Sequence, residues 1–212
     1  MIIDTAETII LIHGLWMRGL VLLPLQRRLR AGGYSVRRFS YPSWRGGLEE
    51  NARSLSSCVS ETPGAVIHLV AHSLGGLVAL HMLSRQPDAR IRRIVLMGTP
   101  YSGCHCGTTV AGLPALNVLV GRTFRDWFSQ PRPALNHEIE IGVIAGTLPV
   151  GLGRLVPGLA RPNDGLVSVS ETHIAAARDS ITLNVSHTGM LVSRLCTRQI
   201  SNFLRSGIFV HD

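Results

Sequence analysis

A serine stands where the pattern of a buried strand changes into that of a helix. The run Val66–Val70 is short and β-branched, which predicts a buried strand. The run Leu77–Leu83 is apolar on nearly every face and predicts a buried helix. Ser73 lies at the turn between them, where its Oγ would be exposed beside the amides that open the helix. Ser73 is therefore a candidate nucleophile, and it needs a base to take its proton.

The sequence around this serine reads A-x-S-x-G, in which Ala71 and Gly75 supply the small neighbours of a sharp turn. One glycine of the usual G-x-S-x-G pattern is thus an alanine. The same residues also fit a serine that only caps a helix. A pattern this short leaves both interpretations open, and the rest of the chain has to separate them.

Other residues able to do chemistry follow other predicted strands. Because ligands bind outside the carboxyl ends of parallel strands, we expect these residues to gather at one edge of the sheet. Strands are predicted over Thr8–Ile12, Ile91–Met97, Ile139–Ala145 and Ile181–Val185, and beyond them come His13-Gly14-Leu15, Thr99-Pro100, Asp164 and His187, respectively.

Helical patterns separate these strands along the chain. They cover residues 20–31, 46–60 and 190–204, with Leu191, Leu195 and Ile200 expected to point inward in the last, and a further strand is predicted over Tyr34–Phe39. Alternating strands and helices are typical of an α/β fold with a mostly parallel sheet and helices on both faces. A chain of 212 residues fits one domain, residues 1–212.

A long stretch without a strand pattern interrupts this alternation between residues 101 and 138. It contains an apolar run, Ala111–Val120, and the aromatic residues Phe124, Trp127 and Phe128. Insertions of this length often serve as a lid or as the wall of a pocket. The alternative is an ordinary pair of helices packed on the sheet.

Five segments in this order resemble those of serine α/β-hydrolases of the lipase and esterase type. They read H-G-L-W, H-L-V-A-H-S-L-G-G, G-T-P-Y-S-G, N-D-G-L-V-S-V-S and S-H-T-G-M-L, and they span residue 9 to about residue 191. The resemblance implies the α/β-hydrolase fold, in which the triad residues follow one another as serine, acid and histidine. It implies no metal and no organic cofactor.

The resemblance also implies a role for each matching residue. Ser73 would attack an acyl carbonyl, His187 would move the proton, and Asp164 would orient the imidazole. The backbone N–H groups of Leu15 and Leu74 would bind the oxyanion, each donor contributing roughly 3–4 kcal/mol in known cases. Trp16, beside Leu15, is assigned to substrate binding with these two residues.

Each histidine has a competing interpretation. His187 could be a capping or surface histidine, because the chain has nine histidines. His72 flanks Ser73 but is expected to point away from it, since neighbouring side chains on a turn diverge. His13 is expected to fix the oxyanion loop, and His68 to be a hydrogen-bonded core residue.

The acid has alternatives as well. Asp164 lies in the turn Asn163-Asp164-Gly165 and could be a turn aspartate only. Glu171 and Asp179 are the fallback acids, although neither lies in as good a turn.

These residues predict hydrolysis of carboxylic esters with an apolar acyl chain, from a small molecule or a lipid. The segments Leu113–Val120 and Phe124–Phe128 are candidates for the pocket wall. The same residues would suit thioester or amide hydrolysis, or acyl transfer. A further alternative is a hydrolase-like protein that binds lipid without catalysis.

The charge of the chain bears on its partners. The net charge is +8, and all 21 basic residues are arginines. No aromatic residues interleave with the arginine clusters, so no nucleic-acid partner is expected. Weak attraction to an anionic membrane surface is the more plausible role of this charge. Residues 1–7 lack the basic region of a secretory signal, and no apolar run reaches the roughly 20 residues of a membrane span. We therefore expect a cytoplasmic protein, with peripheral membrane contact as an option.

The four cysteines do not form a paired metal motif. Cys104 and Cys106 flank His105, but no second cluster of ligands stands near them in the sequence. With Cys58 and Cys196, they are expected to be free thiols in a reducing compartment.

Overall fold

The computed structural model describes residues 7–135 and 139–211. Its centre is a six-stranded sheet with the strand order β2-β1-β3-β4-β5-β6, in which every neighbouring pair is parallel. The strands are β1 (Thr8–Ile12), β2 (Ser35–Phe39), β3 (Ile67–His72), β4 (Ile91–Met97), β5 (Glu140–Gly146) and β6 (Asp179–Leu183). This confirms the predicted α/β fold with a parallel sheet.

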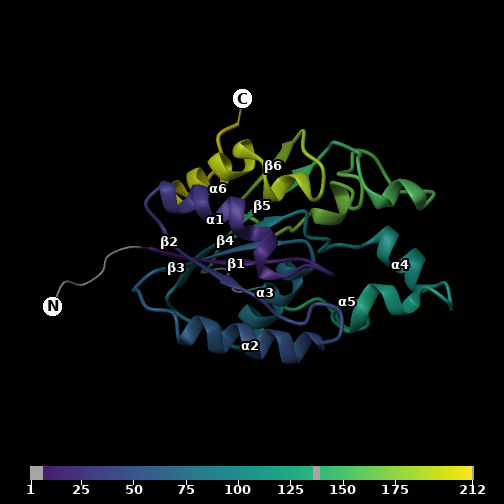
Figure 1. Ribbon diagram of the computed structural model, residues 1–212, viewed down its shortest axis with the longest axis horizontal. Helices are drawn as coiled ribbons and strands as arrows, with labels where there is room; N and C mark the ends of the chain where they lie inside the picture. Colours follow the sequence, from purple (N-terminus) through teal and green to yellow (C-terminus); the bar gives the residue numbers. More distant parts are fainter. Residues whose placement is uncertain (1–6, 136–138, 212) are drawn as a thin grey trace.

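Helices cover both faces of the sheet (Figure 1). The helices are α1 (Leu23–Ala31), α2 (Leu48–Ser60), α3 (Leu74–Arg85), α4 (His105–Ala111), α5 (Gly121–Phe128) and α6 (Arg194–Ser206). Short 3-10 turns occupy Gly19–Leu22, Asn117–Val120, Leu152–Leu155, Ser170–Thr172 and Gly189–Leu191. Every described helix is too short or too polar to cross a membrane.

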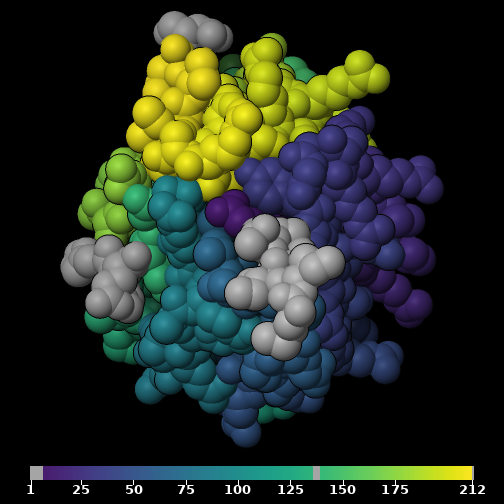
Figure 2. All heavy atoms as spheres, turned by 90° about the vertical axis from the view of Figure 1, so that its left-hand side faces the viewer, coloured from purple at the N-terminus to yellow at the C-terminus, as the bar shows by residue number. Residues whose placement is uncertain are grey.

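The two faces of the sheet bury separate apolar clusters. Helices α1 and α6 contribute Leu25, Leu29, Ile200 and Phe203 to one of them. Figure 2, which views the molecule from the side where the strands begin, shows these two helices (dark blue and yellow) side by side at the top. Helices α2, α3 and α5 cover the other face. Because both faces are covered, the central strands are mostly apolar and buried; all five residues of β1 are buried.

The parallel register brings the chemistry-bearing segments to one edge of the sheet. Ile12 pairs with Ala71, and Ala71 pairs with Leu96, so β1, β3 and β4 end together. The segments after these strands, together with those after β5 and β6, lie on the right-hand side of Figure 1. This edge is where the predicted site was expected.

The C-terminal part differs from the sequence prediction in two details. Strand β6 occupies Asp179–Leu183 rather than 181–185. Helix α6 begins at Arg194 rather than 190, because the Ser193 hydroxyl caps it by accepting a hydrogen bond from the Cys196 amide at 3.2 Å. This start turns Leu195 outward, where it is 37% exposed, so its predicted inward position is wrong.

The segment between residues 101 and 138 divides into two parts. In α5, Phe124 and Trp127 are buried in the core, and the Leu48 amide of α2 donates to Asp126 at 2.9 Å. This part is a packed helix, as in the alternative of an ordinary helix packed on the sheet, and whether it also forms a pocket wall stays a prediction. Residues 112–119 are exposed instead, and their apolar side chains include Leu113 and Val118. Residues 136–138 of the predicted insertion lie outside the described residues.

Candidate active site

Ser73 occupies a strained turn between β3 and α3. Its φ of 54° and ψ of −125° are unusual for a residue with a side chain. The turn is held by hydrogen bonds on both sides: the Ser73 amide donates to the Met97 carbonyl at 2.9 Å, and the Thr99 hydroxyl donates to the Ser73 carbonyl at 3.1 Å. Ser73 is thus more than a helix cap, and its side chain makes no capping hydrogen bond.

Small residues make this turn sterically feasible. A Cβ on Gly75 would collide with the His13 carbonyl, and one on Gly76 would collide with the Thr99 side chain. Ala71, which departs from the usual glycine, lies within β3 with its methyl group fully buried in the core. The alanine is therefore accommodated by the strand, and the tight contacts fall on the glycines that follow Ser73.

Ser73, His187 and Asp164 form a continuous hydrogen-bonded chain. His187 Nδ1 lies 2.7 Å from Asp164 Oδ2, and His187 Nε2 lies 3.0 Å from Ser73 Oγ. With Nδ1–H donating to the carboxylate, Nε2 is left to accept the serine proton. All three residues are buried. The structure thus brings together three residues that are more than 20 positions apart in the sequence.

Asp164 is fixed by its own turn. Its Oδ1 accepts hydrogen bonds from the amides of Leu166 and Val167 at 2.9 and 2.7 Å, which leaves Oδ2 for His187. Its backbone carbonyl accepts from the His187 amide at 2.9 Å. The turn that suggested a merely structural aspartate therefore aims this carboxylate at the histidine.

The fallback acids have other partners. Glu171 accepts hydrogen bonds from the Ser168 amide at 2.7 Å and from the His105 amide, so it ties the start of α4 to the loop that carries Asp164. Asp179 lies at the beginning of β6 and accepts from the Phe209 amide at 2.7 Å. Neither carboxylate contacts His187 through a hydrogen bond.

His72 makes a contact that the sequence did not reveal. Its ring does not bond to Ser73 Oγ; instead its Nε2 lies 2.9 Å from the backbone carbonyl of His187. Burial and, to a lesser extent, the nearby His187 lower the pKa of His72 to about 3. His72 is therefore neutral, with Nε2–H donating to that carbonyl. No local sequence signal could have paired residues 115 positions apart.

The loop after β1 passes directly over the nucleophile. A Cβ on Gly14 would lie 3.1 Å from Ser73 Cβ, so only a glycine allows this approach without crowding. Leu15 and Trp16 come next, and Trp16 has a φ of 58° with its side chain exposed. Leu74 opens α3 on the other side of Ser73. In the described residues, neither the Leu15 nor the Leu74 amide donates to a protein acceptor.

His13 holds this loop in place. Its Nδ1 lies 2.9 Å from the Gly14 carbonyl, its Nε2 lies 3.3 Å from the Tyr41 amide, and its ring stacks on Tyr41. Burial lowers the pKa of His13, so the ring is held in its neutral form. These contacts agree with the structural position expected for His13. His68 is a buried strand residue that contacts Glu7 at 3.3 Å, at the opposite end of β3.

Gly98 is a further residue that the sequence did not single out for the site. It follows β4 with a φ of +57°, and a Cβ there would lie 3.1 Å from both Asp164 Oδ2 and His187 Nδ1. The Asp164–His187 hydrogen bond thus lies against the bare backbone of Gly98. A glycine directly after a strand was the available signal, but its neighbours are set by tertiary packing.

The four cysteines take no part in the chain of hydrogen bonds from Asp164 through His187 to Ser73. All four are buried and unpaired as thiols. Burial raises the pKa of Cys104 to about 12 and those of Cys106 and Cys196 to about 11. Within the described residues, no group of three or more histidine, cysteine and carboxylate side chains is arranged to hold a metal ion.

Comparisons with known proteins agree with the fold. The sequence model of the Alpha/beta hydrolase family matches residues 9–197. One similar solved structure is a metagenomic carboxyl esterase, which is 20% identical; the match covers 87% of this chain and 65% of that chain, with a TM-score of 0.66. Another is a Bacillus licheniformis lipase in propeptide form, which is 16% identical; the match covers 95% of this chain and 50% of that chain, with a TM-score of 0.76. A pyrethroid hydrolase from Sphingobium faniae is 16% identical; the match covers 95% of this chain and 98% of that chain, with a TM-score of 0.62. No curated protein sequence matches significantly.

These likenesses differ in what they cover. The chain spans 65% and 50% of the lengths of the first two structures, and at these identities the structural likeness shows the fold alone. The family model, by contrast, covers most of the sequence, from the first strand to the last helix. On this match, the chain belongs to the alpha/beta hydrolase family.

Proposed function

We propose that the protein is a serine hydrolase that cleaves carboxylic ester bonds. The observation that carries this proposal is the buried chain of hydrogen bonds from Asp164 through His187 to Ser73, at 2.7 and 3.0 Å. A carboxylate, an imidazole and a hydroxyl in this arrangement are the parts of an activated serine nucleophile.

In the proposed reaction, Ser73 Oγ attacks the ester carbonyl while His187 Nε2 takes the hydroxyl proton. His187 then gives that proton to the leaving alcohol, and an acyl-enzyme remains on Ser73. Water attacks the acyl-enzyme with His187 again as the base, which releases the acid and restores the serine. Asp164 keeps the imidazole in the tautomer with Nδ1–H and stabilises its charged form.

The amides of Leu15 and Leu74 are proposed to bind the oxyanion. Gly14 brings the first loop against Ser73, and Leu74 is the first residue of α3, so both amides lie beside the nucleophile. The helix start adds its dipole to the Leu74 donor. Both are backbone groups, so the proposal depends on Gly14 and on the turn at Ser73 rather than on leucine side chains.

Exposed apolar side chains near this edge support a substrate with an apolar acyl chain. Trp16 follows β1, Leu116 lies between β4 and β5, and Leu155 lies between β5 and β6. Such side chains on the segments beyond the strands favour an apolar ligand or an apolar surface. The similar structures described as a carboxyl esterase, a lipase and a pyrethroid hydrolase agree with ester chemistry.

The experiment is hydrolysis of nitrophenyl esters of increasing acyl length, from acetate to palmitate, by the native chain and by Ser73→Ala and Asp164→Asn. We expect turnover with a preference for acyl chains longer than acetyl. Replacing the aspartate is expected to lower kcat about 10⁴-fold, because the imidazole would lose its orienting acceptor.

Other outcomes would redirect the proposal. Turnover of thioesters or amides but not of oxygen esters would assign the same residues to a different bond. An absence of turnover with every ester would contradict the proposal and favour a hydrolase-like protein that binds lipid.

A further inference from the structure

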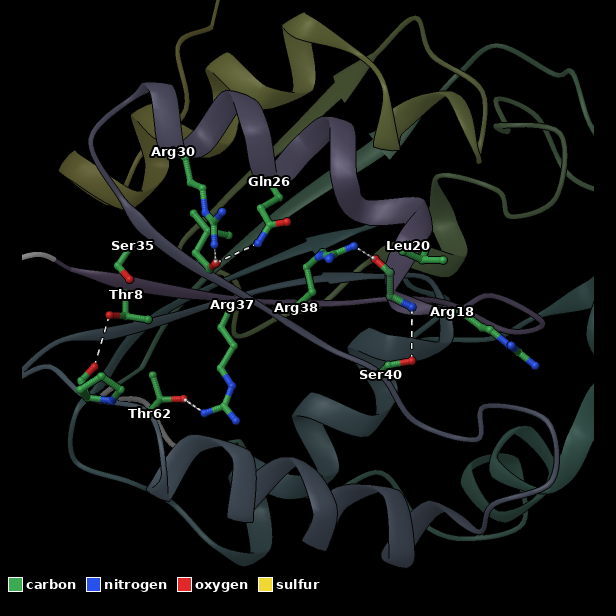
Figure 3. A pocket seen from close by; sticks show the side chains of 13 residues that line it. Thr8, Arg18, Leu20, Gln26, Arg30, Ser35, Arg37, Arg38, Ser40 and Thr62 are labelled. Carbon is green, nitrogen blue, oxygen red and sulfur yellow. Dashed lines mark hydrogen bonds between the residues drawn. The ribbon is translucent and has the colours of Figure 1, made fainter.

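A cavity lies along the outer edge of the sheet, away from Ser73. Strand β2 is the first strand in the sheet order, so one of its edges has no neighbouring strand. The cavity beside it measures about 610 Å³, a size typical of ligand pockets. Figure 3 shows α1 above this edge and the residues at the end of α2 below it.

The lining of this cavity is strongly basic. Four arginines line it, namely Arg18, Arg30, Arg37 and Arg38, and no aspartate or glutamate does. Within the described chain, the one carboxylate that pairs with any of them is Glu61, 3.4 Å from Arg37 in an exposed ion pair. Such pairs are weak. Among the described residues, the lining therefore carries an excess of positive charge that is not balanced locally.

Backbone carbonyls hold two of these arginines in position. Arg30 Nη2 donates to the Val36 carbonyl at 3.0 Å, and Arg38 Nη1 donates to the Gly19 carbonyl at 3.0 Å. Each of these bonds uses one of the five N–H donors of a guanidinium. The remaining donors stay available, and the side chains lose less conformational freedom on binding because they are already fixed.

The same bonds argue against an added peptide strand as the occupant. The Val36 carbonyl, on the open side of β2, accepts hydrogen bonds from both Gln26 Nε2 at 2.9 Å and Arg30. A strand docking on this edge would have to displace both donors. The edge is thus blocked against strand pairing, while the cavity beside it keeps its charged and hydroxyl donors.

The arrangement of the arginines suggests the number of anionic groups. In Figure 3, Arg37 points down toward Thr62, just after α2, whereas Arg38 points up from the strand, where it bonds the Gly19 carbonyl. These neighbouring side chains leave β2 on opposite sides. A ligand with several anionic groups is therefore better suited to contact both than a ligand with one. Guanidinium groups bind phosphate oxygens in a bidentate manner, which makes phosphate the best matched group.

We propose that the cavity at the β2 edge binds a ligand that presents two or more phosphate groups, through Arg30, Arg37 and Arg38. The phosphates could come from a soluble polyphosphate compound or from the head groups of an anionic phospholipid surface. This site is separate from the Ser73 chain of hydrogen bonds, so the proposed binding does not depend on the proposed hydrolysis.

The test measures binding of inorganic tripolyphosphate by calorimetry and binding to vesicles by flotation. The vesicles contain phosphatidylcholine alone or mixed with phosphatidylglycerol. The cavity variant is Arg37→Glu, and its matched control is Arg27→Glu, which makes the same charge change at an exposed arginine outside the cavity. Neither side chain holds the backbone, and circular dichroism checks the folding of both. A second variant, Arg30→Gln/Arg38→Gln, tests the fixed arginines.

The proposal predicts saturable binding that weakens at least tenfold in Arg37→Glu and remains within about twofold in Arg27→Glu. Saturable tripolyphosphate binding that is weakened in Arg37→Glu but not in Arg27→Glu would support a soluble ligand. Binding confined to vesicles with phosphatidylglycerol, with the same dependence on variants, would support a lipid head group. Equal losses in both glutamate variants, or no binding in either assay, would overturn the proposal and leave the arginines as charges that protect a sheet edge.

Discussion

His72 Nε2 donates a hydrogen bond to the backbone carbonyl of His187 at 2.9 Å. The amide of the same His187 donates to the backbone carbonyl of Asp164 at 2.9 Å. The backbone of the proposed base is thus held on one side by the residue before the nucleophile and on the other side by the acid. His72 is in this sense a positioning residue, which acts through His187 and has no bond to the reacting hydroxyl.

Replacing His72 with phenylalanine is expected to lower kcat for ester hydrolysis by roughly tenfold to a hundredfold with little change in KM. The phenylalanine keeps the ring but cannot donate to His187, and small misplacements of catalytic groups cost about this much. The control is His68→Phe, another buried histidine of β3 at the end remote from Ser73. A KM increase without a kcat decrease, or equal effects of both variants, would contradict the positioning role.

Stability should fall as the pH drops through the acid range, because of His72. Burial keeps its folded-state pKa at about 3, whereas an unfolded histidine titrates near 6.5. Between these pKa values the unfolded chain binds more protons than the folded protein does. The free energy of unfolding therefore decreases as the pH falls, by about 2 kcal/mol from pH 7 to pH 5. Denaturant unfolding at both pH values measures this. His72→Phe should show a smaller loss, and an identical loss would rule out His72 as its source.

Gly98→Ala should damage both stability and activity. The added methyl would lie 3.1 Å from Asp164 Oδ2 and His187 Nδ1, and the φ of +57° is strained for alanine. We expect a destabilisation of about 1–3 kcal/mol and a fall in kcat.

The comparison for this variant is Gly103→Ala, where the nearest atom to an added methyl is 3.9 Å away. Thermal unfolding and ester turnover of the two alanine variants distinguish a local clash from a general effect of replacing glycine. Wild-type behaviour of Gly98→Ala would show that the Asp164–His187 pair tolerates crowding.

Residues 112–119 are proposed to act as a lid that responds to a lipid surface. If they do, the rate of ester hydrolysis should rise more steeply once the substrate exceeds its solubility limit. Leu113→Ser/Leu116→Ser should remove that rise and leave turnover of dissolved short esters intact. The control is Ile208→Ser/Val210→Ser, which changes two exposed apolar residues near the C-terminus. A rate strictly linear through the solubility limit would contradict the lid.

The buried thiols should resist alkylation while the protein is folded. Burial raises the pKa of Cys104 to about 12 and that of Cys196 to about 11, so little thiolate exists at neutral pH. Mass spectrometry after iodoacetamide treatment should show no rapid modification of the native chain and four modified cysteines after unfolding. Fast labelling of any cysteine in the native protein would contradict the burial described for it.

The sequence predicted those parts of the site that depend on local patterns. The strand before Ser73 and the helix after it follow from two apolar runs, and the Asp164 turn follows from its three residues. Carboxyl ends of parallel strands share one edge, so the gathering of Ser73, Asp164 and His187 was predictable from topology.

The remaining features depend on contacts between distant segments. His72 and His187 meet only because β3 ends beside the loop after β6, and Gly98 approaches the acid–histidine pair for the same reason. The start of α6 was misplaced because Met190 and Leu191 continue the apolar pattern, although the cap at Ser193 sets the helix. Likewise, an amphipathic pattern does not tell whether Phe124 and Trp127 face a substrate or the core.

The most direct measurement is the mass of the intact protein after exposure to a fluorophosphonate, for the native chain and for Ser73→Ala. The proposal predicts one covalent adduct on the native protein and none on the variant, because only a serine activated by His187 attacks phosphorus at a useful rate. An adduct that persists in Ser73→Ala, or a folded native protein that stays unmodified with and without detergent, would contradict the assignment of Ser73 as an activated nucleophile.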